Sequence, residues 1–138
     1  MQQTTFSDAR AELAELYDRA LAHNPTKIDR RRADPAVLLS LADFRDVLRR
    51  YEFAPEVLFE ADAVAIWLPE LSIWGRGATF EEARDDLLDE VSELLAQLEV
   101  DARLRSAPNI VDRLPWIFRL MTTATEDERQ AVLFADPT

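Results

Sequence analysis

The amino-acid sequence predicts an α+β protein made of two small modules, a β-α-β-β-α module followed by a β-β-β-α module, with a short helical tail. Short apolar runs of strand length alternate with longer stretches in which apolar residues recur at the spacing of one helix face. Helix-capping motifs precede these amphipathic stretches. The charge is also unevenly distributed. Residues 1–51 contain nine Lys/Arg and eight Asp/Glu, a net charge of +1, whereas residues 52–138 contain seven and nineteen, a net charge of −12, which together give the chain's −11.

The first module spans residues 1–51. A short β-forming run precedes Ser7, whose hydroxyl is expected to cap a helix that ends at Asn24-Pro25. The side chains expected to face inward from this helix are Ala9, Leu13, Leu16, Tyr17, Ala20 and Leu21.

Two further strands and a second helix complete this module. Residues 26–29 and 36–40 are the predicted strands, joined by a charged turn, and Ser40 is expected to cap the helix with Asp43 at the capping-box position. The side chains expected to face inward from the second helix are Leu41, Phe44, Val47, Leu48 and Tyr51.

The second module is predicted over residues 55–100, after a polar, proline-containing boundary near residues 49–56. Runs rich in β-branched and aromatic residues at 57–60, 63–68 and 71–74 are the predicted strands.

A T-x-x-E capping box at Thr79 and Glu82 then starts a long helix, and Gly75 and Gly77 before it are expected to serve a turn or bulge. One side of this helix carries an apolar stripe. The other side is acidic, with Glu81, Glu82, Asp85, Asp86, Asp89, Glu90 and Glu93.

Residues 101–138 form the predicted helical tail. Pro108 and Pro115 interrupt it, and a second capping box begins at Thr125. Trp116, Ile117, Leu120 and Met121 could present an apolar face, and Trp67, Trp74 and Trp116 could be either core residues or interface anchors.

The composition excludes several kinds of chemistry. The chain has no cysteine and one histidine, His23, so disulfides, thiolate metal sites and cysteine nucleophiles are excluded. Nothing supplies a nucleophile–base pair, so we expect no enzymatic activity, no catalytic residue, no metal site and no cofactor. No apolar run approaches membrane-spanning length and the N-terminus lacks a signal-peptide pattern, which indicates a soluble cytoplasmic protein without a membrane partner.

The main basic feature is the run Arg30, Arg31 and Arg32, with Lys27 nearby and Arg10 in the first helix. Guanidinium groups are permanently charged and donate bidentate hydrogen bonds, so they suit phosphate oxygens. The alternative interpretation is an exposed turn neutralised by neighbouring aspartates.

The acidic helix face has two interpretations as well. It could be a solvated surface, or it could be a docking face for a basic protein. A calcium site is disfavoured because helical spacing does not provide the oxygen-rich loop that calcium prefers.

The first module resembles the Phd/YefM antitoxins. Residues 6–13 are similar to the opening S-x-A-R-x-x-L of that family, and residues 30–44 are similar to its R-R…P-A-V-L-x-S-x-x-x-[FY] block, although the family commonly has a glycine where this chain has residues 32–34. The resemblance implies a dimeric module that binds and represses its own operator. Arg10 and Arg30 fall on the DNA-contacting arginines of the family, and Arg31, Arg32 and Lys27 are added on charge alone.

The second module resembles HicB-like antitoxins, on a P-E-L…G-x-[ST]-x-E-E-A pattern within residues 63–98. The whole arrangement is similar to a Phd-like antitoxin family associated with RelE/RelB-type systems. The resemblance implies a type II antitoxin with two partners, operator DNA and a cognate toxin, that acts as a homodimer or a higher even-numbered oligomer.

The expected function is therefore neutralisation of a basic, RelE-like ribonuclease toxin, together with autorepression of the operon. The candidate toxin-binding residues lie on the acidic helix and in the tail: Glu82, Asp85, Asp86, Asp89, Trp116, Ile117 and Leu120. Two alternatives stay open: a stand-alone transcriptional regulator whose C-terminal half senses a ligand or stabilises the dimer, and an interaction module with neither DNA nor toxin as partner.

Overall fold

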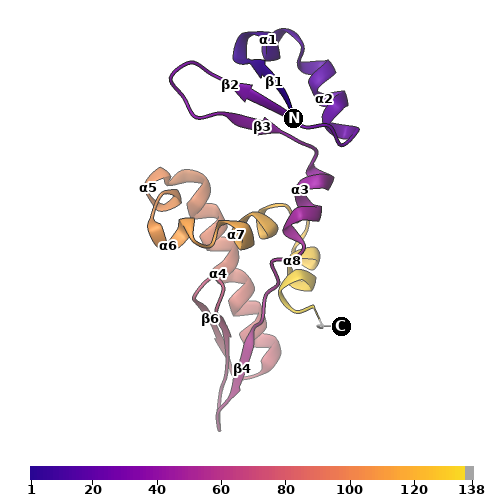
Figure 1. Ribbon diagram of the computed structural model, residues 1–138. Helices are drawn as coiled ribbons and strands as arrows, with labels where there is room; N and C mark the ends of the chain where they lie inside the picture. The colour runs from indigo at the N-terminus through magenta and orange to yellow at the C-terminus, as the bar shows by residue number, and fades with distance from the viewer. Residues whose placement is uncertain (136–138) are drawn as a thin grey trace. The chain divides into compact units, whose positions relative to one another are not determined.

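The computed structural model describes residues 1–135 and has a mixed α+β architecture with two small sheets and several short helices (Figure 1). The chain divides into two compact units, Met1–Val47 and Leu48–Thr138. Each unit contains one three-stranded sheet of its own.

The first unit has the order β1 (Gln2–Thr5), α1 (Phe6–Ala11), α2 (Leu13–Leu21), β2 (Thr26–Asp29), β3 (Ala36–Leu38) and the start of α3 (Leu41–Leu48). The strand order in the sheet is β1-β2-β3. Strands β1 and β2 run parallel, with Thr4 opposite Ile28, and β3 is antiparallel to β2. The two parallel strands therefore end at the same edge, where α1 and the β2–β3 loop begin.

The helix caps of this unit differ in part from the sequence-based expectation. The cap of α1 is Thr5, whose Oγ1 accepts a hydrogen bond from the Asp8 amide at 3.1 Å, and not Ser7. Ser40 does cap α3 through the Asp43 amide, but the carboxylate of Asp43 lies 2.6 Å from the ring Nδ1 of His23.

The predicted apolar stripe of the first helix is only partly buried. Leu16 and Ala20 are buried, whereas Leu13, Tyr17 and Leu21 are each 58% exposed. The expectation that α3 buries Leu41 and Val47 is also wrong, because both side chains are more than half exposed. The physical reason is the same for both helices: a unit of this size has a single layer of helices on one small sheet, and that layer can bury only part of a wide apolar stripe.

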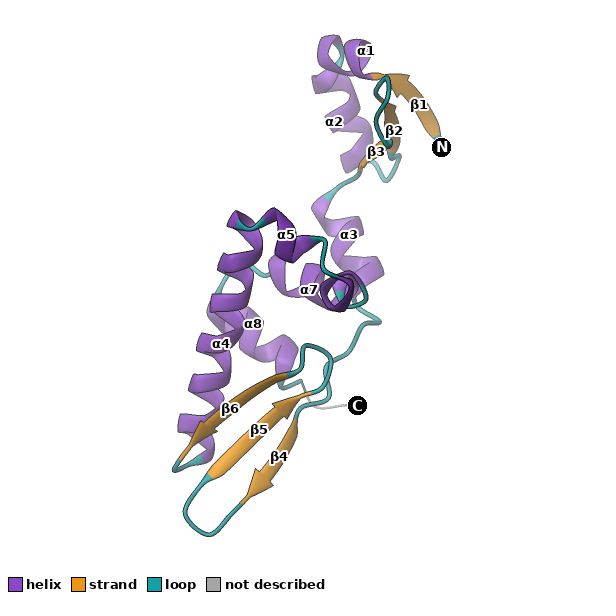
Figure 2. Cartoon of the chain, turned by 90° about the vertical axis from the view of Figure 1, so that its left-hand side faces the viewer, coloured by secondary structure: helices purple, strands orange, loops and turns teal. Residues whose placement is uncertain are grey.

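The second unit begins with an antiparallel meander of β4 (Glu56–Phe59), β5 (Val64–Leu68) and β6 (Ile73–Gly77). Helix α4 (Phe80–Val100) follows and lies along the sheet (Figure 2). Thr79 caps it, accepting a hydrogen bond from the Glu82 amide at 3.2 Å, while the Glu82 carboxylate accepts one from the Ala78 amide at 2.8 Å. Thr79 and Glu82 therefore both cap the start of α4 as predicted, although the Glu82 carboxylate accepts from the amide of Ala78 rather than from that of Thr79.

Gly75 and Gly77 do not form the expected turn or bulge but belong to strand β6. A methyl group at Gly75 would come within 2.6 Å of the Leu87 Cβ, and one at Gly77 would come within 2.7 Å of the Ala83 amide nitrogen. The glycines therefore allow α4 to pack directly on the backbone of β6.

The tail folds into the core of the second unit. Its helices are α5 (Ala102–Arg105), α6 (Pro108–Val111), α7 (Leu114–Met121) and α8 (Glu126–Leu133). Side chains from the tail share one core cluster with the sheet and α4, and the tail members that are buried in it are Ile110, Ile117, Leu120 and Leu133.

Polar contacts also attach α7 to the segment that precedes β4. The Trp116 indole Nε1 donates to the Glu52 carbonyl at 3.0 Å, and the Arg119 guanidinium donates to the Tyr51 carbonyl at 2.7 Å. The Tyr51 and Trp116 rings meet edge to face, 5.2 Å apart. Burial lowers the pKa of Arg119, an effect that the nearby Glu52 carboxylate opposes.

Candidate functional site

Arg30 and Arg31 lie beside the start of α1, where the β2–β3 loop begins. The Arg30 guanidinium lies over the Phe6 ring, 4.8 Å from its centroid. Phe6 and Arg10 are four residues apart on α1 and so share a helix face. Arg30 therefore stacks on Phe6, and Arg10 lies one helical turn further along the same face of α1.

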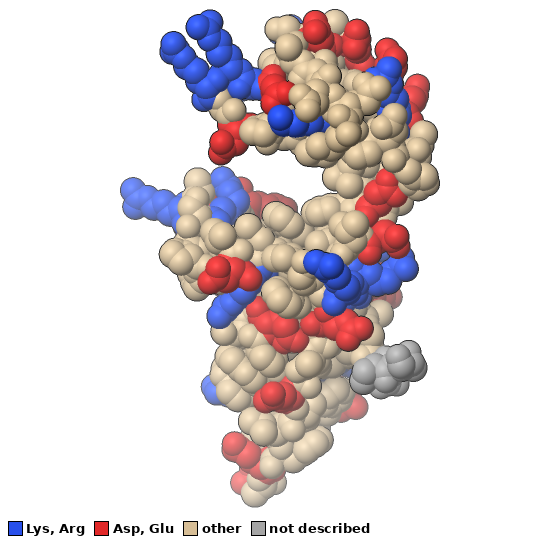
Figure 3. Space-filling view, viewed as in Figure 1, with Lys and Arg blue, Asp and Glu red and all other residues tan. Residues whose placement is uncertain are grey.

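A shallow depression lies at the same place, lined by Thr5, Phe6, Ser7, Asp29, Arg30 and Arg31. The side chains of Arg10, Arg30, Arg31 and Arg32 are all exposed. In Figure 3, basic side chains project outward from the first unit beside the β2–β3 loop.

Lys27 and Arg32 differ from the other candidates. Lys27 lies on the sheet in an ion pair with Asp29, with 3.3 Å between the charged atoms. Arg32 has a φ of 60°, in the left-handed region that favours glycine. The loop therefore adopts at Arg32 a backbone conformation that glycine takes more readily than an arginine does.

The acidic candidates on α4 fall into two groups. Glu82 belongs to the capping box, and the Asp86 carboxylate accepts a hydrogen bond from the Arg76 amide at 2.8 Å, so both have structural roles. Asp85 and Asp89 are exposed, and the nearest cation to Asp85 is Arg84 at 3.5 Å.

The tail candidates are placed differently from the sequence-based expectation. Ile117 and Leu120 are fully buried in the core, so these side chains are not available to a partner in this structure. Trp116 is half-buried and held by its contacts with Tyr51 and Glu52. The periodicity that suggested an apolar interface is that of a core helix.

The other two tryptophans lie on the sheet. Trp67 and Trp74 are cross-strand partners with ring centroids 4.7 Å apart, and Trp74 is 37% exposed. Since side chains alternate along a strand, both point away from the face that buries Ile66 and Leu68.

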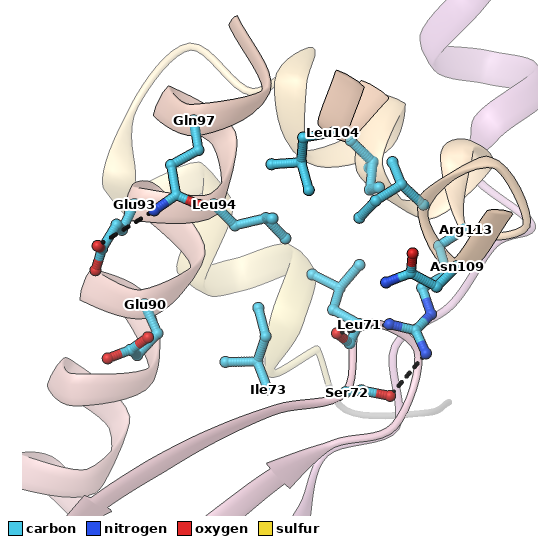
Figure 4. A pocket seen from close by; sticks show the side chains of 12 residues that line it. Leu71, Ser72, Ile73, Glu90, Glu93, Leu94, Gln97, Leu104, Asn109 and Arg113 are labelled. Atoms are coloured by element: carbon cyan, nitrogen blue, oxygen red, sulfur yellow. Dashed lines mark hydrogen bonds between the residues drawn. The ribbon is translucent and has the colours of Figure 1, made fainter. Parts of the chain in front are cut away.

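A groove in the second unit brings together residues that the sequence did not group. Its volume is about 470 Å³, and its walls come from α4, from the turn before β6 and from the tail (Figure 4). The residues that line it are Leu71, Ser72, Ile73, Glu90, Glu93, Leu94, Gln97, Leu104, Asn109, Ile110, Arg113 and Ile117.

The two long walls of this groove carry charges of opposite sign. On the α4 side, Glu90 and Glu93 provide carboxylates, and Gln97 Nε2 donates to Glu93 at 3.4 Å. On the tail side, Arg113 donates to the Leu71 carbonyl at 3.1 Å and to the Ser72 hydroxyl at 2.8 Å, so its guanidinium is held within the wall. Periodicity along α4 could have suggested the first wall, but the second wall is made by packing of the tail.

Residues 1–135, the part of the chain that the structure describes, have two further properties. No group of three or more metal-ligating side chains could hold an ion there. No helix in that part of the chain is long and apolar enough to cross a membrane.

Comparison with known proteins identifies the family. The fold, with one candidate surface on each unit, is that of a small two-unit binding protein. Residues 1–135 match the family model described as antitoxin of toxin–antitoxin, RelE/RelB, TA system. The chain belongs to this antitoxin family. It is therefore the antitoxin of a toxin–antitoxin system, which implies a cognate toxin as partner and suggests a regulatory rather than an enzymatic protein.

A solved structure has the same fold. It is the crystal structure of a protein from Syntrophomonas wolfei subsp. wolfei, described as an antitoxin part of a toxin/antitoxin system; the TM-score is 0.83 at 20% sequence identity, over 99% of each chain. No curated protein matched the chain.

Proposed function

We propose that this protein is a type II antitoxin that neutralises a basic, RelE-like ribonuclease toxin by direct binding through its second unit and represses its own operon through its first unit. The observation that carries the proposal is the division of charge between the two units. Residues 1–47 contain seven Lys/Arg and eight Asp/Glu, whereas residues 48–138 contain nine and nineteen.

Operator binding is assigned to the surface of Arg10, Arg30 and Arg31, with Arg32 and Lys27 beside it. Phosphate contacts by Lys and Arg provide most of the affinity for DNA. A near-neutral unit that gathers exposed arginines on one side can approach a duplex. The acidic second unit would repel a duplex and would attract a cationic protein.

A homodimer through the first unit is part of this proposal. Leu13, Tyr17 and Leu21 are spaced four residues apart on α2, and all three are more than half exposed. Val37 of β3 and Leu41 of α3 add exposed apolar surface to the same small unit. Apolar patches of this kind mark protein–protein contacts, and a second copy that covers them would also double the arginine surface.

Toxin binding is assigned to the second unit. Asp85 and Asp89 on α4 are exposed and add to the negative field that steers a basic partner. The resemblance of the sequence of residues 63–98 to HicB-like antitoxins also supports this role, because those antitoxins act on toxins.

The alternative function is a stand-alone regulator that senses a ligand. A second pocket of about 560 Å³ favours it. The lining contains three phenylalanines and two arginines: Arg49, Glu52, Phe53, Ala54, Pro55, Val57, Phe80, Arg119, Val132, Phe134 and Ala135. Such a mixture of apolar surface and fixed cations suits a small amphipathic anion.

Arg10→Ala combined with Arg30→Ala tests the division of labour. We expect operator binding in an electrophoretic shift to be lost at moderate salt, with a salt dependence lowered by about 0.9 in log–log slope for each phosphate contact removed. Neutralisation of the toxin should stay intact. Loss of both activities would mean that these arginines stabilise the fold.

The matched control removes two arginines from the second unit, Arg76→Ala with Arg103→Ala, and should leave operator binding unchanged. Co-expression with the neighbouring gene then separates the two functions: co-purification and rescue of growth support the antitoxin, whereas operator binding without either supports the regulator.

A further inference from the structure

We propose that the groove of the second unit receives a cationic segment of the cognate toxin, which places one bulky apolar side chain on the groove floor and its Lys or Arg side chains against Glu90 and Glu93. This inference rests on the proposed neutralisation by direct binding. It names the place on the second unit where the contact is made.

The floor of the groove is apolar and is built from three separate segments. Leu71 and Ile73 come from the turn and strand before α4, Leu94 comes from α4, and Leu104 comes from the tail (Figure 4). Ile73, Leu94 and Leu104 are only half-buried, so they retain surface that a partner could cover. A volume of about 470 Å³ is within the range of pockets that bury organic ligands and is ample for a large side chain.

The charged rim selects a cation. Glu90 and Glu93 lie three residues apart on α4, and in the described part of the chain neither forms a salt bridge. Arg113, the cation on the opposite wall, donates hydrogen bonds to the Leu71 carbonyl and the Ser72 hydroxyl, so its guanidinium does not pair with these glutamates. An incoming Lys or Arg would therefore find two carboxylates without a cationic partner beside an apolar floor.

The net charge decides between classes of partner. With nineteen Asp/Glu against nine Lys/Arg in residues 48–138, this unit repels nucleic acid and anionic membrane surfaces. An apolar floor beside acidic side chains instead matches a basic protein segment that carries an apolar anchor, the usual composition of a binding hot spot with a charged rim. The cognate toxin is the partner that the family implies.

The test compares two double charge reversals on the same helix. Glu90→Lys with Glu93→Lys changes the groove rim, and Asp85→Lys with Asp89→Lys makes the same change in net charge on carboxylates that do not line the groove. Long-range steering changes equally in both, so a difference between them reports local contact.

We expect the groove variant to raise the Kd of the full-length antitoxin for its toxin at least about tenfold more than the control variant, mainly through faster dissociation. The control variant should mainly slow association, and this effect should fade as salt is added. Equal effects of the two variants would overturn the groove as the contact.

A second pair of variants tests the groove without any change of charge. Asn109 is exposed and lies on the tail-side wall, so Asn109→Trp would fill the groove without disturbing the core. We expect weaker toxin binding for Asn109→Trp and normal binding for Asn109→Ala, with the same thermal unfolding for both. Normal binding of Asn109→Trp would also overturn the inference.

The outcomes separate this inference from the function on which it rests. If the unaltered antitoxin does not bind the toxin, direct neutralisation is wrong and the groove has no toxin to receive. If it binds and the groove variants bind equally well, neutralisation stands and only the groove is wrong.

Discussion

The two units of this antitoxin use their apolar residues in opposite ways. In residues 1–47 the buried apolar side chains are Ala9, Leu16 and Ala20, while Tyr17 and Leu21 on the same helix as Leu16 are exposed. In the second unit the sheet, α4 and the tail bury a continuous cluster of large side chains. The difference teaches that the second unit buries a core of its own, whereas the first leaves apolar surface that suits a second chain.

The largest expected effect is on the core of the second unit. Ile117→Ala should destabilise this unit by about 2–5 kcal/mol, because it leaves a cavity beneath α7 where the tail meets the sheet and α4. Chemical denaturation followed by tryptophan fluorescence would measure it. A loss of unfolding free energy below about 1 kcal/mol would mean that the tail is not part of the core, and that the contrast drawn between the two units is wrong.

The next effect concerns the exposed stripe of the first unit. Tyr17→Glu with Leu21→Glu should dissociate the proposed homodimer and weaken operator binding at least about tenfold, since buried aromatic and aliphatic anchors carry most interface energy. Light scattering and electrophoretic shifts would measure both. Phe59→Glu is the control, because Phe59 is an exposed apolar residue of the second unit, and it should leave both unchanged.

The smallest effect concerns the β2–β3 loop. Arg32→Gly should stabilise the first unit by about 1 kcal/mol, because an L-residue other than glycine is disfavoured at a φ of 60°. Comparison of operator binding then shows what Arg32 contributes. Unchanged affinity would limit DNA contact to Arg10, Arg30 and Arg31, and weaker affinity would explain why an arginine occupies this strained position.

Local signals in the sequence predicted much of the fold. Thr79 with Glu82 and Thr125 with Glu128 predicted the starts of α4 and α8, because capping depends on residues three apart in the chain. The last strand was predicted at residues 71–74 but is β6, Ile73–Gly77. From the sequence, two glycines close together predict a turn, and only the packing of α4 on β6 shows that they belong to the strand.

The candidate surfaces were less predictable than the helices and strands, because they depend on contacts between segments that are far apart in the sequence. Arg10 and Arg30 were predicted from the family resemblance, and Arg31, Arg32 and Lys27 were added on charge alone. The stacking of Arg30 on Phe6 was not predicted, because it depends on the parallel pairing of β1 and β2. Glu90 and Glu93 were part of a long acidic face. Only the packing of residues 102–117 against α4 separates them from Asp85 and Asp89.

The sequence by itself determined the order and type of most elements and the unequal charge of the two units, because hydrogen-bonded caps, side-chain periodicity and net charge are properties of neighbouring residues. The tertiary structure decided which apolar residues are buried and where a groove opens. Burial depends on how many layers of chain can cover a surface, and that quantity belongs to the packed unit rather than to any segment of it.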